Sequence, residues 1–88
     1  MIERLHVATR YSEAAIHNGV VYLAGQVPND ATKDIEGQTA EVLVMIDDLL
    51  TQARSSKDHL LTVTVYLADM ADYAGMNKVW DAWLNQGF

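Results

Sequence analysis

Residues 12–27 read SEAAIHNGVVYLAGQV, and this stretch decides how the first half of the chain folds. Asn18-Gly19 stands between two segments that can both be extended. A two-residue type I′ turn needs a positive φ at both central positions, and asparagine followed by glycine tolerates this best. We therefore predict a β-hairpin with strands over 12–17 and 20–27. Pro28 cannot donate a ladder hydrogen bond and ends the second strand.

Working outward, residues 2–8 alternate weakly between apolar and polar side chains, which predicts a short strand before the hairpin. Residues 36–54 predict a helix, whose start Asp34 or Glu36 would favour electrostatically. Its apolar side chains recur at i, i+4, i+7, i+8 and i+11 on one face: Val42, Ile46, Leu49, Leu50 and Ala53.

The second half repeats the same two kinds of pattern. Leu60–Leu67 reads LLTVTVYL, a β-branched alternating run that predicts a strand. Asp69 is placed to cap a second helix, which Gln86-Gly87 would end. The apolar face of that helix carries Tyr73, Met76, Val79, Trp80 and Trp83, and we expect both tryptophans in the core.

The predicted order is β-β-β-α-β-α, an α+β fold. The last strand would follow a right-handed crossover, giving a mixed sheet with both helices on one face. The other face, with Tyr22, Tyr66 and several threonines, would be available to a partner.

Composition narrows the possible functions. The 88 residues allow one domain, and a core of that size is small, which favours self-association. There is no cysteine, and the three histidines lack metal-ligand spacing, so we expect neither a metal nor another cofactor. The net charge of −6 disfavours nucleic acid. Without a membrane-length apolar run or a signal-peptide pattern, we expect a cytoplasmic protein that does not bind membranes.

Five stretches, in this order and spacing, resemble the RidA/YjgF (reactive-intermediate deaminase) family, older name endoribonuclease L-PSP. They are RYSEA (10–14), VYLAGQVP (21–28), QT with IDDLL (38–39 and 46–50), VTVYLADM (63–70) and MNKVWDAW (76–83). The resemblance covers nearly the whole chain. It implies a chorismate-mutase-like fold and a homotrimer with ligand clefts between subunits. It also implies hydrolysis of small enamines and imines, of the 2-iminobutanoate or 2-iminopropanoate type, to ketoacids and ammonia.

The resemblance also implies substrate-binding residues. Tyr11 matches the family's cleft tyrosine, Gly25 the glycine whose backbone lines the pocket, and Asn77 the helix asparagine near the cleft. Ala24 stands where well-studied deaminases have a serine, so one hydroxyl contact is lost. From the residues alone, Glu13 is a candidate base, although a solvated glutamate is the more common case. The catalytic residues are not assigned.

In the family, the arginine that pairs with the substrate carboxylate lies in a segment after the position of Phe88. That segment also holds the last two strands, one of which lies between the strands matched by 20–27 and 60–67. We therefore interpret residues 1–88 as a single, C-terminally shortened RidA-like domain with impaired deaminase activity. Two alternatives stay open: a non-catalytic trimeric module that binds small carboxylates, and an inactive relic. Without the intervening strand, 20–27 and 60–67 would either pair directly or recruit strands from another chain.

Overall fold

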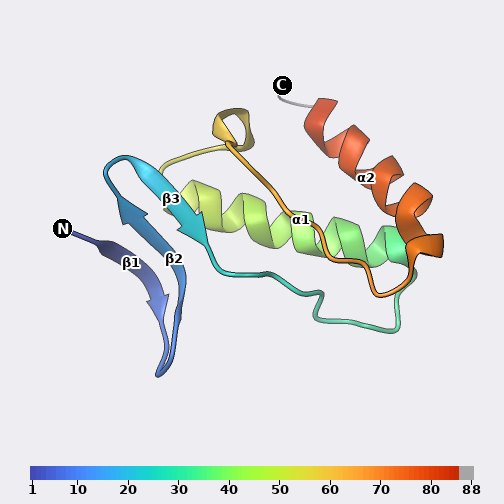
Figure 1. The fold of residues 1–88 in the computed structure, drawn as a ribbon, viewed down its shortest axis with the longest axis horizontal. Coiled ribbons are helices and arrows are strands. Elements are labelled where there is room, and N and C mark those ends of the chain that lie inside the picture. The colour runs from blue at the N-terminus through green and yellow to red at the C-terminus, as the bar shows by residue number, and fades with distance from the viewer. Residues whose placement is uncertain (86–88) are drawn as a thin grey trace.

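A computed structural model describes residues 1–85 of the chain and confirms the α+β class (Figure 1). Three strands come first: β1 (Glu3–Val7), β2 (Ser12–His17) and β3 (Val20–Leu23). Helix α1 (Ile35–Gln52) follows, then the 3₁₀ helices η1 (Lys57–His59) and η2 (Met70–Asp72), and finally α2 (Tyr73–Asn85). The expected end of the second helix at Gln86-Gly87 lies outside the described residues.

The three strands form an antiparallel meander in the order β1-β2-β3. The predicted hairpin is confirmed, because Asn18 and Gly19 both have positive φ, at 53° and 78°, and His17 pairs with Val20 across the turn. β3 is shorter than the expected 20–27. Its pairing to β2 ends with Ala24, whose N–H donates to the Glu13 carbonyl at 2.9 Å.

Helix α1 is fixed at both ends by local hydrogen bonds. Asp34 is the N-cap, and its carboxylate accepts from the Gly37 N–H at 2.8 Å. At the C-terminal end, Arg54 takes a left-handed conformation with φ of 62°. The N–H groups of Arg54 and Ser55 then donate back into the last turn, at 3.0 and 2.8 Å. This is a Schellman motif, which ends the helix two residues before the expected boundary.

The prediction of a strand at 60–67 is wrong for the described structure. No backbone hydrogen bond within residues 1–85 involves 61–68, and the segment runs past α1 as an extended trace (Figure 1). The physical reason is that a strand needs a neighbouring strand, and its sequence pattern alone supplies none. As a consequence, the expected parallel crossover does not form, and the sheet is antiparallel rather than mixed.

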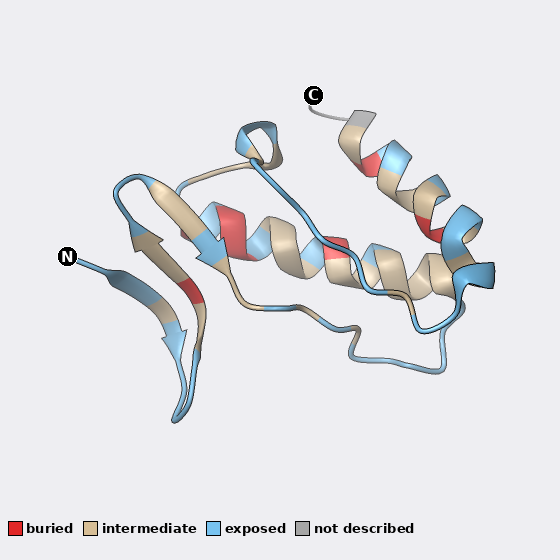
Figure 2. Cartoon of the chain, viewed as in Figure 1, coloured by how far each residue is buried: buried red, intermediate tan, exposed pale blue. Residues whose placement is uncertain are grey.

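The core lies between the sheet, α1 and α2, with α1 in contact with both β3 and α2 (Figure 2). The predicted core roles of Leu49, Leu50 and Trp83 are confirmed. On α1, Leu43 is buried, whereas the expected Val42 is only half-buried. The described buried set is small: Ala14, Leu43, Leu49, Leu50, Ala53, Met76 and Trp83.

Trp83 is held by polar contacts as well as by packing. Its indole N–H donates to the Asp47 carboxylate at 2.8 Å, which joins α2 to α1. The Lys57 ammonium lies 5.0 Å from the Trp83 ring centroid and donates to the Trp83 carbonyl. Trp80 is half-buried, with its ring centroid 5.5 Å from that of Trp83. Trp83 therefore joins α2 to α1, whereas Trp80, which was also expected in the core, is only half-buried beside it.

Candidate functional site

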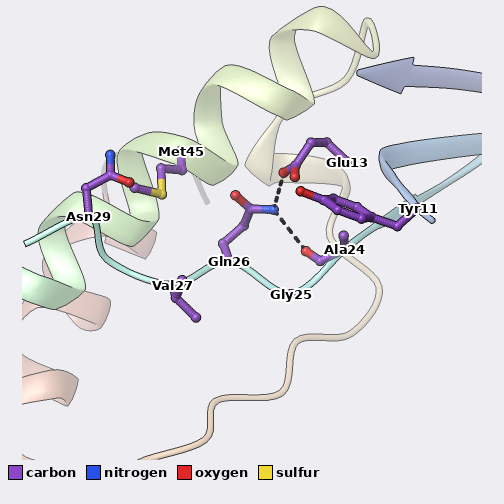
Figure 3. Close-up of a pocket in the computed structure, with 8 residues that line it drawn as sticks. All are labelled: Tyr11, Glu13, Ala24, Gly25, Gln26, Val27, Asn29 and Met45. Atoms are coloured by element: carbon purple, nitrogen blue, oxygen red, sulfur yellow. Dashed lines mark hydrogen bonds between the residues drawn. The ribbon is translucent and has the colours of Figure 1, made fainter. Parts of the chain in front are cut away.

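An open hollow of about 540 Å³ lies where the chain leaves β3 and passes α1 (Figure 3). It is formed by the start of β2, the segment after β3, and one residue of α1. Its lining residues are Tyr11, Glu13, Ala24, Gly25, Gln26, Val27, Asn29 and Met45. Tyr11 is 58% exposed, so its ring forms an accessible wall of the hollow rather than part of the core.

A hydrogen-bonded pair, Glu13 and Gln26, forms the polar part of the hollow. The Gln26 side-chain amide donates to Glu13 Oε2 at 2.8 Å and to the Ala24 carbonyl at 3.1 Å. Figure 3 shows the Tyr11 ring beside this pair. These two contacts hold the Gln26 amide in one orientation, with its NH₂ group directed at Glu13 Oε2. Glu13 Oε1 takes part in no hydrogen bond within residues 1–85.

The rim of the hollow at Asn29 is fastened to α1 by Glu41. The Glu41 carboxylate accepts from the backbone N–H groups of Asn29 and Asp30, the latter at 3.0 Å, and pairs with the Lys33 ammonium at 2.7 Å. The hydrogen bond from Lys33 lowers the pKa of Glu41, and the same contact raises the pKa of Lys33. Glu41 therefore positions the loop that carries Asn29.

The structure brings together three of the four sequence-predicted site residues. Tyr11, Ala24 and Gly25 line the hollow, although they come from separate stretches of the chain. Asn77 is half-buried on α2 and is not among the lining residues. Its predicted ligand contact stays a prediction.

Sequence reasoning missed several lining residues. Gln26 and Val27 belong to the same VYLAGQVP stretch as Gly25, so that motif was the signal for them. Asn29 follows Pro28, which was interpreted only as the end of a strand. Met45 had no signal, because its place depends on how α1 packs against the segment after β3.

Arginine side chains lie beside the hollow but not in it. A second, smaller hollow of about 330 Å³ is lined by residues 7–12 and Arg4, and it shares Tyr11 with the first. Arg4 and Arg10 both line this second hollow. The part of the chain that the structure describes thus places one carboxylate, that of Glu13, and no cation in the candidate site.

Neither a membrane helix nor a metal cluster is found in the described structure. Within residues 1–85, no helix is long and apolar enough to cross a membrane. The same residues bring no three His, Cys, Asp or Glu side chains together as metal ligands. The cytoplasmic location stays a prediction.

Comparison with known proteins gives the family. The family model for endoribonuclease L-PSP matches residues 1–88. A RutC family protein of Haemophilus ducreyi is 51% identical over 84 residues, which are 96% of this chain and 72% of the relative. The RutC family protein YoaB of Escherichia coli is 42% identical over 86 residues, covering 98% of this chain and 75% of the relative.

Solved structures agree. A YjgF family member from Neisseria meningitidis superposes with a TM-score of 0.91 at 46% identity, over 94% of this chain and 69% of that one. Yeast Mmf1 gives a TM-score of 0.91 at 26% identity, over 97% and 77% of the two chains. The chain belongs to the endoribonuclease L-PSP (RidA/YjgF) family, as the resemblance of its motifs predicted.

Proposed function

We propose that the hollow beside Tyr11 and Gly25 binds a small 2-imino or 2-oxo acid, and that the chain is a weak enamine/imine deaminase of the RidA type. The observation that carries the proposal is the gathering of Tyr11, Ala24 and Gly25 around one accessible hollow that also contains an acidic side chain. In the reaction, water adds to the imine carbon and the carbon–nitrogen bond breaks. The products are a ketoacid and ammonia.

Glu13 is the group best placed to hold the attacking water. One of its carboxylate oxygens accepts from Gln26, which fixes the carboxylate plane, and the other faces no partner within residues 1–85. A carboxylate in this position can accept a proton from water as the water attacks, which is the role of a general base. Gln26 acts on this step by orienting Glu13.

The charge of the lining set is the reason that we propose weak activity. Carboxylate-bearing ligands are normally held by a guanidinium through two parallel hydrogen bonds. Here the Glu13 carboxylate would repel the carboxylate of such a ligand. No lining residue in the described structure is cationic, so nothing among them offsets this repulsion. We propose that the missing cation comes from outside this lining set, in a homotrimer whose clefts lie between subunits.

The hollow without a cationic lining residue in the described structure also favours a second candidate, a module that binds small ligands without turnover. The two differ in the role of Glu13, which would be needed for hydrolysis but not for binding. A relic without function would show neither hydrolysis nor ligand binding.

The test is imine hydrolysis with the purified chain. A pyridoxal-phosphate dehydratase acting on serine supplies 2-iminopropanoate, and the rate of pyruvate formation is measured with and without the chain. We expect a modest acceleration that is lost in Glu13→Gln and kept in Asp81→Asn, which removes an exposed carboxylate on α2.

Binding is measured in parallel by titrating pyruvate and following the amide signals of Tyr11 and Gly25 by NMR. If the amide signals shift but pyruvate formation is not accelerated, the chain is a binding module and not a deaminase. If neither the rate nor the amide signals change, the proposal is wrong for this hollow.

A further inference from the structure

The second hollow contains two arginines that take part in no ion pair within residues 1–85. The chain has six lysines and arginines in all. Three of them form ion pairs with glutamates, and Lys57 lies against the Trp83 ring. The remaining two are Arg4 and Arg10, and both line the second hollow. Their guanidinium groups are therefore available to a ligand.

The β1–β2 hairpin brings the two arginines together. Arg4 lies on β1, and Arg10 lies in the loop between β1 and β2 (Figure 1). The Ala8 N–H donates to the Tyr11 carbonyl at 2.7 Å, which closes this loop. All the residues that line the second hollow come from this hairpin. The site is therefore local, and it is built without any contact from a distant part of the chain.

The chemistry of the second hollow suits a carboxylate. No acidic residue is among its lining residues, so the two positive charges in it repel each other unless an anion is bound. Each guanidinium carries five N–H donors in a planar fork that matches the two oxygens of a carboxylate. The hydroxyl groups of Thr9 and Ser12 line the same hollow and can donate further hydrogen bonds.

Tyr11 connects this hollow to the candidate site, because it lines both of them. On the other side of the connection, its ring lies beside Glu13 and Gln26 (Figure 3). Counting Glu13 with Arg4 and Arg10, the joined hollows carry a net positive charge, whereas the whole chain has a net charge of −6. A local field of this sign attracts an anionic ligand to an otherwise acidic protein.

We propose that the ligand of the candidate site carries a second, distal carboxylate, which Arg4 and Arg10 bind in the second hollow. The ligand is then a 2-imino or 2-oxo dicarboxylic acid that lies across Tyr11. This inference rests on the proposed function, because the 2-imino or 2-oxo end occupies the hollow beside Gly25. Arg4 and Arg10 determine the specificity, since they distinguish a dicarboxylic acid from a monocarboxylic acid of the same length.

Two five-carbon acids test the proposal, because 2-oxoglutarate and 2-oxopentanoate differ only in the distal carboxylate. Each is titrated into the isotope-labelled chain, and the amide signals of Gly25 and Thr9 are followed by NMR. We expect both acids to shift Gly25 and only 2-oxoglutarate to shift Thr9. We also expect 2-oxoglutarate to bind about tenfold more tightly, as two partly exposed ion pairs allow.

Arg10→Gln should reduce this preference to about threefold or less and leave the Kd of 2-oxopentanoate unchanged. Arg4→Gln is the second variant, and it should have the same effect without altering the loop. Lys78→Gln is the matched control, because it changes the net charge equally at an exposed site on α2 and should keep the preference. Dispersed NMR spectra of all three variants check that the fold is intact.

Each contrary result has a distinct meaning. Equal affinities for the two acids, with shifts at Gly25, would overturn this inference and leave the proposed function standing. A loss of affinity for both acids in Arg10→Gln would also overturn it, because the arginines would then bind the 2-carboxylate that the acids share. Shifts at Thr9 without shifts at Gly25 would show a separate anion site instead of one ligand across Tyr11. If neither acid shifts either signal, the inference and the proposed function are both wrong.

Discussion

Replacing Arg54 by glycine should relieve backbone strain at the end of α1 while it removes an ion pair, so the gain is measured against Arg54→Ala. Arg54 has a φ of 62° at the end of α1, a conformation that costs a residue with a Cβ about 1–2 kcal/mol. Glycine avoids this cost but gives the unfolded chain more freedom, which offsets about 0.4–1 kcal/mol. The backbone effect alone should therefore stabilise the folded state by about 0.5–1 kcal/mol.

The ion pair of Arg54 with Glu3, 3.0 Å apart, must be separated from that effect. Both side chains are largely exposed, so the pair contributes about 0.2–1 kcal/mol. Arg54→Ala loses the pair and keeps the left-handed strain, which makes it the reference for Arg54→Gly. We expect the free energy of unfolding of Arg54→Gly to exceed that of Arg54→Ala by about 0.5–1 kcal/mol, which corresponds to a few degrees in Tm for a domain of this size.

Urea and thermal unfolding followed by circular dichroism measure these differences. High salt should shrink the gap between wild type and Arg54→Ala, because it screens the pair, and leave the gap between the two variants unchanged. If Arg54→Gly is no more stable than Arg54→Ala at either ionic strength, Arg54 does not form the left-handed end of α1 and the reasoning fails.

Two further predictions concern α2 and the rim of the hollow. A Cβ on Gly75 would lie 2.5 Å from Ile35 Cγ2, so Gly75→Ala should destabilise by about 1 kcal/mol, overpacking outweighing the gain in helix propensity. In an Ile35→Ala background the same change should become stabilising, and urea unfolding that showed the same sign in both backgrounds would refute the contact. Because the Lys33 hydrogen bond lowers the pKa of Glu41, the contribution of Glu41 to stability is present above its ordinary pKa of 4.5 and is lost as pH falls through the lower folded value. Glu41→Gln should flatten this acid-side loss in unfolding curves taken between about pH 5 and 3, and an unchanged pH profile would show that the pair does not hold the loop.

Local signals in the sequence predicted local structure well. Asn18-Gly19 fixed the hairpin because the turn depends on the φ angles of those two residues alone. Asp34 was a candidate for the start of α1 for a similar reason. Leu60–Leu67 failed because strand formation depends on a partner that the pattern does not contain. Leu43 replaced Val42 in the core because neighbouring helix positions differ by about 100°, and the apolar stripe is wide enough to include either.

The residues of the candidate site also divide into those that local sequence signals predicted and those that depend on distant packing. Tyr11, Ala24 and Gly25 were predicted from motif resemblance, and the hollow collects them because β2 and β3 are hairpin partners. Met45 could not be predicted, since only the docking of α1 brings it to the hollow. Asn77 matched a motif, yet its helix packs away from the hollow within the described chain.

The meander has a consequence for the order of folding. Within residues 1–85, each strand pairs only with its neighbour in sequence, through loops of a few residues. Hairpins of this kind close on the order of 1–10 μs, far faster than sheets assembled from remote segments. We therefore expect the docking of α1 onto the sheet to be the slower step, so that substitutions at the contact between α1 and β3 change the folding rate more than substitutions in the Asn18-Gly19 turn.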